Sequence, residues 1–217
     1  MVYRDAINFV TTLQEIDTTR IALWGDSMSG AEVLVVGSID QRVKAIIAQV
    51  PAFGDEPPPP DPDGKLFDTL RETFLHGDVS GTPETTTDRM PVVSFDQGRI
   101  SSLLFPLTAF RWFIEYGGRY GTNWQNWATI VTPATPVPLH PVLCAPHLRS
   151  ALLLVIAQED EMEGANSNIA RMAWNIAPQP KELVEVDGGH FGLLYYPSSL
   201  FDQAKQVQSD FLIKHLA

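Results

Sequence analysis

The sequence predicts an α/β protein, in which a parallel sheet is flanked by helices and interrupted by a mainly helical insertion. Two runs, at residues 43–50 and 151–157, are almost continuously apolar, as is typical of parallel strands buried on both faces. Helix-period patterns alternate with these runs. Four consecutive prolines at residues 57–60 end the alternation, because proline fits neither a helix interior nor a central strand. We therefore expect a core of residues 1–51 and 148–217, with an inserted cap or lid at residues 52–147.

The first part of the core reads as helix, strand, helix, strand. Apolar residues three or four apart predict a helix over Tyr3–Ile16, and a short apolar run predicts a strand over Ile21–Trp24. Ala31–Val36 has helical character and precedes the buried strand Val43–Val50. After the insertion the alternation resumes. Its expected elements are a strand at Ala151–Ala157, a helix at Asn166–Ile176, a strand at Glu182–Val186 and an amphipathic helix at Phe201–Leu216.

The insertion combines two helical patterns with many aromatic residues. We expect helices at Lys65–His76 and Leu107–Tyr116, separated by a polar loop at Gly77–Asp88. The aromatic residues either line an apolar acyl or aryl pocket or form the core of the insertion itself. Under the first reading, the candidate pocket residues are Trp112, Trp124, Trp127 and, outside the insertion, Phe191.

Composition excludes several classes of protein. The 217 residues carry a formal net charge of −11, which repels phosphate backbones and leaves nucleic-acid binding without an electrostatic basis. The single cysteine, Cys144, excludes an internal disulfide and a cysteine-cluster metal site, and its apolar neighbours indicate a small buried side chain. No run is apolar and long enough to span a bilayer, and no basic, apolar leader is present. We therefore expect a cytoplasmic location.

The stretch from Ile21 to Gly37 has the pattern of a nucleophile elbow. An apolar strand ends at Gly25-Asp26-Ser27-Met28-Ser29-Gly30, and a helix pattern follows at once. In the strict Gly-x-Ser-x-Gly pattern the last glycine would stand at Ser29, but Gly30 keeps a small residue at the next position. The alternative is an ordinary strand-to-helix turn in which Ser27 or Ser29 caps the helix.

Two further residues complete a possible catalytic triad with Ser27. A serine hydroxyl needs a histidine as general base and a carboxylate that orients the imidazole. Asp160 and His190 each follow a predicted strand, which places them with Ser27 at the carboxyl edge of one sheet. Glu161 is the reserve acid. Asp26 and Glu32 lie in or beside the elbow itself, too close in sequence to the serine to orient the histidine.

The segments RIALWGDSMSGAEVLVV, ALLLVIAQEDE and VDGGHF resemble the α/β-hydrolase superfamily, and within it the dienelactone-hydrolase-like and peptidase-like bacterial serine hydrolases. The resemblance implies a partial α/β-hydrolase fold with Ser27 as nucleophile, His190 as base, Asp160 as acid and the backbone N–H of Met28 as an oxyanion donor. It also implies hydrolysis of esters or related acyl compounds without a metal or an organic cofactor.

In this superfamily several strands precede the elbow, whereas here only one helix is expected before Ile21. We therefore expect the first strands, and the loop that gives a second oxyanion donor, to be missing. The strand before Ser27 would then be an apolar sheet edge, which suggests a homodimer that pairs along it. Two functions follow: a serine esterase with a small-molecule substrate, or an inactive α/β-hydrolase-like module whose cap binds an apolar ligand.

Overall fold

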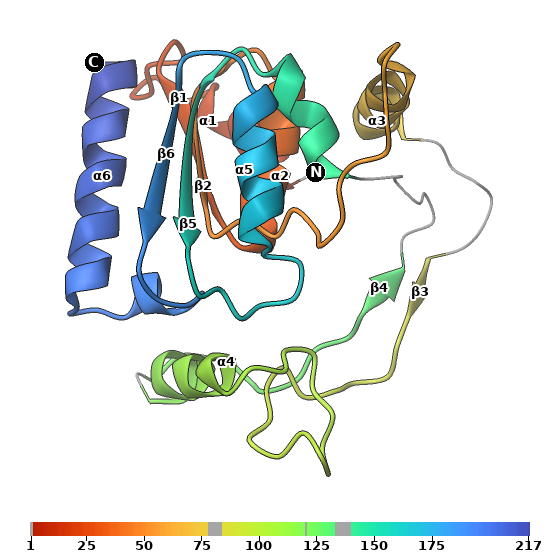
Figure 1. Ribbon diagram of the computed structural model, residues 1–217, viewed down its shortest axis with the longest axis vertical. Coiled ribbons are helices and arrows are strands. Elements are labelled where there is room, and N and C mark those ends of the chain that lie inside the picture. Colours follow the sequence, from red (N-terminus) through yellow and green to blue (C-terminus); the bar gives the residue numbers. More distant parts are fainter. Residues whose placement is uncertain (1, 78–83, 120, 133–139) are drawn as a thin grey trace. The chain divides into compact units, whose positions relative to one another are not determined.

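A computed structural model describes residues 2–77, 84–119, 121–132 and 140–217 (Figure 1). The chain forms two compact units. The first contains residues 1–74 and 138–217, and the second contains residues 75–137. These boundaries differ from the predicted ones because two segments assigned to the insertion pack into the core of the first unit. They are the start of helix α3 (Lys65–His76), through Phe67 and Leu70, and the 3₁₀ helix η2 (Pro141–His147).

The first unit is built on a four-stranded parallel sheet in the order β1-β2-β5-β6. Its strands are β1 (Ile21–Asp26), β2 (Val43–Gln49), β5 (Ala151–Ala157) and β6 (Lys181–Val186). All three pairings are parallel, and Ala48 of β2 lies between Gly25 of β1 and Leu154 of β5. The parallel α/β class predicted from the apolar runs is therefore confirmed.

Helices cover both faces of this sheet (Figure 1). On one face lie α2 (Met28–Ile39) and α5 (Ser167–Ile176), and on the other lies α6 (Ser199–Leu216). Alternate residues of the strands supply the two cores: Ile46 packs on the α2 side, and Ile47 packs on the α6 side. Burial on both faces explains why β2 and β5 are almost continuously apolar.

The first helix is shorter than expected. Helix α1 covers Val2–Val10, whereas the apolar spacing predicts a helix that continues to Ile16. The hydroxyls of Thr11 and Thr12 donate to the carbonyls of Asn8 and Phe9, at 3.0 and 2.7 Å. Such side-chain bonds compete with helix continuation, and the predicted stripe beyond Val10 is exposed at Leu13 and Ile16.

The second unit has little regular structure. Strands β3 (Thr85–Thr86) and β4 (Val131–Thr132) form a short antiparallel pair. Helix α4 (Leu107–Trp112) continues as the π-helical segment η1 (Phe113–Gly118), where the sequence predicts a single helix to Tyr116. Side-chain hydrogen bonds add to a few backbone bridges: the Asn126 amide both accepts from and donates to the backbone of Val93, at 3.0 and 2.9 Å. Residues 78–83 of the predicted polar loop lie outside the described residues.

Candidate active site

Ser27 occupies a strained turn between β1 and α2. Its φ of 56° and ψ of −119° lie in a region that residues with a side chain rarely adopt, at a typical cost of about 1–3 kcal/mol. Two backbone bonds, to the last residue of β2 and to the segment after it, hold the turn: Ser27 N–H donates to Gln49 O at 3.0 Å, and Ala52 N–H donates to Ser27 O at 2.9 Å. Ser27 stands at the N-cap position of α2, but its side chain makes no capping bond. Helix capping therefore does not explain the serine.

Two glycines give the turn the space that it needs. A Cβ at Gly25 would lie 2.1 Å from the carbonyl oxygen of Ser29, and a Cβ at Gly30 would lie 2.9 Å from the Cβ of Pro51. The crowded positions are thus Gly25 and Gly30, so a serine fits at position 29, where the strict motif has glycine. Helix α2 begins at Met28, whose N–H has no partner within the helix because it belongs to the first turn.

Asp160 and His190 form a buried pair after β5 and β6. The two oxygens of the Asp160 carboxylate lie 3.0 and 2.9 Å from His190 Nδ1, and the side chains are 4% and 2% exposed. Met162 N–H also donates to Asp160 Oδ1, at 3.0 Å, which fixes the carboxylate. A proton on Nδ1, shared with Asp160, leaves Nε2 as the acceptor nitrogen of a neutral imidazole. The reserve acid, Glu161, instead accepts a hydrogen bond from the backbone N–H of His190.

The end of β1 lies within the electrostatic reach of this pair. Burial raises the pKa of Asp26 to about 6, while Gln49 and the charge of His190 oppose that rise and the charge of Asp160 adds to it. Asp26 ends β1, and Asp160 and His190 follow β5 and β6, so the elbow and the Asp160–His190 pair lie at one edge of the parallel sheet, as the strand ends predict. No hydrogen bond joins Ser27 to His190 within the described ranges.

A chain of side-chain hydrogen bonds, which the sequence did not predict, ends at Asp26 beside the elbow. Gln49 Nε2 donates to Asp26 Oδ1 at 2.7 Å, and Gln208 Nε2 of α6 donates to Gln49 Oε1 at 2.6 Å. Trp24 Nε1 closes the chain by donating to Gln208 Oε1 at 3.0 Å. The feature of the sequence that could have indicated this chain is Gln49, a polar residue at the end of the apolar run of β2, whose amide is buried.

The candidate pocket residues divide between the units. Trp112 stacks on Tyr116 with ring centroids 5.3 Å apart, Trp124 packs on Phe113 at 5.7 Å, and Arg89 lies 4.0 Å above the Trp127 ring. These contacts are internal to the second unit. Phe191 belongs to the first unit, where it is buried with its ring edge-on to His190 at 5.2 Å.

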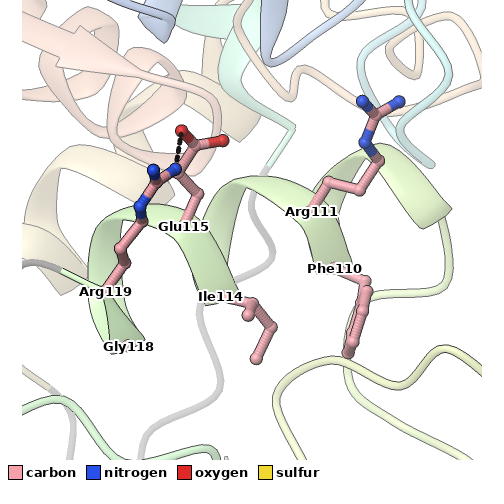
Figure 2. Close-up of a pocket in the computed structure, with 6 residues that line it drawn as sticks. All are labelled: Phe110, Arg111, Ile114, Glu115, Gly118 and Arg119. Carbon is pink, nitrogen blue, oxygen red and sulfur yellow. Dashed lines mark hydrogen bonds and ion pairs between the residues drawn. The ribbon is translucent and has the colours of Figure 1, made fainter.

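A hollow of about 610 Å³ in the second unit has a different lining. It is bordered by Phe110, Arg111, Ile114, Glu115, Gly118 and Arg119, and by none of the three tryptophans. In Figure 2 the charged side chains and the two apolar ones extend to different sides of one helix, so they do not converge on a common ligand position.

Among the residues that the structure describes, two other kinds of chemistry-bearing group offer no second site. Within the described ranges, no three His, Cys, Asp or Glu side chains are grouped so that they could hold a metal ion. Cys144 is fully buried, and burial raises the pKa of its thiol to about 12, so the thiolate is not accessible. The helices in the same ranges are too short or too polar to cross a bilayer.

Several of the known proteins to which this chain is similar are named as hydrolases. Residues 1–56 match the family model for acetyl xylan esterase (AXE1). The thiohydrolase apmlB of Arthrinium phaeospermum is 27% identical, over 99% of this chain and 71% of the relative. Among solved structures, the α/β hydrolase GrgF of Penicillium sp. sh18 is 20% identical with a TM-score of 0.64, over 99% of this chain and 70% of that one. A monoacylglycerol lipase of Paleococcus ferrophilus is 13% identical with a TM-score of 0.58, over 98% and 75%.

Proposed function

We propose that this chain, a member of the α/β-hydrolase superfamily, is a serine hydrolase that cleaves carboxylic esters or related acyl compounds. The observation that carries the proposal is the buried Asp160–His190 pair, which lies at the sheet edge where Ser27 stands in a strained turn. Strain of this kind persists only where the surroundings enforce it, and it is concentrated at functional sites.

In the proposed reaction Ser27 is the nucleophile and His190 is the base. His190 Nε2 takes the proton of the Ser27 hydroxyl while Oγ attacks the acyl carbonyl. Asp160 keeps the second proton of the imidazole on Nδ1 and stabilises the imidazolium. The N–H of Met28 donates to the developing oxyanion. His190 then gives its proton to the leaving alcohol or thiol, and an acyl-enzyme forms on Ser27.

Water completes the cycle by the same route. His190 takes a proton from water, the hydroxide oxygen attacks the acyl-enzyme, and the proton returns to Ser27 Oγ as the acid leaves. The match of residues 1–56 to the acetyl xylan esterase family and the relative named as a thiohydrolase support oxygen esters and thioesters as the first substrates to test. The inactive binding module expected as an alternative is not favoured, because these relatives are named as hydrolases.

A panel of acetyl, butyryl and octanoyl esters and thioesters tests the proposal. We expect hydrolysis by the wild type, no burst or turnover by Ser27→Ala, and a loss of about 10⁴-fold in kcat for Asp160→Asn, the typical cost of releasing the catalytic histidine from its orienting aspartate. Asp187→Asn, an exposed aspartate on the loop before His190, is the matched control and should retain wild-type rates. Equal rates for Ser27→Ala and the wild type would exclude this mechanism.

A further inference from the structure

Two consecutive carboxylates contact the same histidine at different points. Asp160 meets the His190 ring at Nδ1, and Glu161 Oε2 accepts a hydrogen bond from the His190 backbone N–H at 2.9 Å. The first contact orients the imidazole about its own side-chain torsions. The second contact fixes the peptide that carries this side chain, which the ring contact alone does not do.

The loop that carries His190 contains two glycines with different roles. Gly188 has a φ of +127°, which favours glycine on conformational grounds, whereas Gly189 is not among the residues with positive φ. A Cβ at Gly189 would instead lie 2.3 Å from Oε2 of Glu161 and 3.1 Å from its Cδ. Position 189 therefore needs glycine because a side chain would displace the Glu161 carboxylate, and not because its backbone conformation favours glycine.

Backbone bonds pair the two loops only as far as Gly188. Gln158 N–H donates to Val186 O, and Glu159 N–H donates to Gly188 O, each at 3.0 Å. Beyond that point, the hydrogen bond from His190 N–H to the Glu161 carboxylate connects the His190 peptide to the loop after β5. The carbonyl of the same peptide, Gly189 O, accepts from Gly192 N–H at 3.0 Å within its own loop, so the bond to Glu161 is the one that reaches the neighbouring loop.

We propose that Glu161 is a positioning residue for His190, and that Gly189 is the partner that gives its carboxylate access to the His190 N–H. The inference rests on the proposed function, because positioning matters if His190 is a general base that must reach Ser27. It assigns the two neighbouring acids separate tasks: Asp160 acts on the ring, and Glu161 acts on the peptide.

The expected kinetic effect falls on kcat and not on KM. Glu161→Ala should lower kcat about tenfold, which corresponds to about 1.4 kcal/mol in the barrier, because the histidine is less often in reach of the serine. Glu161→Gln should recover most of the rate, since its amide oxygen still accepts the bond. Glu163→Ala, an exposed acid in the same loop, is the matched control and should be unaffected.

The decisive test is a double-mutant cycle between Glu161 and Gly189. Gly189→Ala should push the flexible carboxylate off the His190 N–H and lower kcat about as much as Glu161→Ala. In the Glu161→Ala background, the added methyl meets no carboxylate, so Gly189→Ala should cost little more. Thermal unfolding of each variant confirms that the fold is retained.

Several outcomes would overturn the inference. They are wild-type kcat in Glu161→Ala, equal losses in Glu161→Ala and Glu161→Gln, or fully additive losses in the cycle. Amide hydrogen exchange at His190 gives a readout that does not depend on activity: Glu161→Ala should accelerate exchange at this N–H, and unchanged exchange overturns the inference. If the wild type hydrolyses nothing while this exchange does respond, the proposed function fails and the positioning contact stands.

Discussion

Asp26→Asn removes a buried carboxyl next to Ser27 while it preserves the oxygen that accepts from Gln49. Burial raises the pKa of Asp26 to about 6 from an ordinary value of 3.8. The folded protein therefore holds this proton at pH values at which the unfolded chain has released it. Stability from Asp26 is fully present below pH 3.8 and is lost as the pH rises through 6, because the folded state must then carry the buried charge.

The size of the effect follows from the gap between the two pKa values. The raised pKa lowers the free energy of unfolding by about 3 kcal/mol at pH 7.5, relative to a side chain that stays neutral. At pH 4 the loss is roughly 0.5 kcal/mol, because Asp26 is still protonated in the folded state and about half protonated in the unfolded state. Asparagine carries no charge at either pH. Asp26→Asn should therefore be more stable than the wild type by up to about 3 kcal/mol at pH 7.5 and nearly equal to it at pH 4.

Urea denaturation of both proteins at pH 4, 5, 6 and 7.5 measures this difference. Glu32→Gln, an exposed acid on helix α2, is the control and should stay within about 0.5 kcal/mol of the wild type throughout. A stability gain that does not change with pH would refute the reasoning, since it would not come from ionisation. A loss of stability at pH 7.5 would mean that the carboxylate is held favourably and that burial is not the dominant influence.

Three other predictions concern the elbow and its strand. Ser27→Gly should raise the unfolding free energy by about 1 kcal/mol by relieving the positive φ, whereas Ser27→Ala should not; equal denaturation midpoints would argue against strain. Gly30→Ala should lower the unfolding free energy by about 2 kcal/mol or more because its Cβ meets Pro51, and an unchanged urea midpoint would contradict the close approach. We also propose a homodimer that pairs along β1, which pairs only with β2 within the described residues and leaves Trp24 46% exposed. Light scattering at micromolar concentration should give a dimer for the wild type and a monomer for Trp24→Lys; a wild-type monomer would exclude it.

The elements of the sheet could be predicted because burial on two faces leaves a local signature. Ala151–Ala157 is apolar throughout and is a strand with the predicted bounds. The contact between Asp160 and His190 also followed from local information, because parallel strands end at one edge and the acid and the histidine each follow a strand.

Features that depend on distant partners could not be predicted. Gln49 and Gln208 are 159 residues apart in sequence, so nothing local to either one indicates that their amides meet. Asn126 and Val93 of the second unit are 33 residues apart, and a pairing through a side chain leaves no periodic pattern from which a strand could be predicted. From the sequence, Gly30 could be identified only as a small residue near Ser27. The reason that it must be small is its contact with Pro51, which the sequence does not reveal.

Covalent labelling with a fluorophosphonate tests most directly whether Ser27 is an activated nucleophile. Intact mass would count adducts on the wild type, Ser27→Ala and His190→Ala after equal exposure. The proposed mechanism predicts one adduct on the wild type, none on Ser27→Ala, and none or a greatly slowed reaction on His190→Ala. A folded wild type that takes no adduct, or a Ser27→Ala variant that is labelled as readily as the wild type, would contradict it.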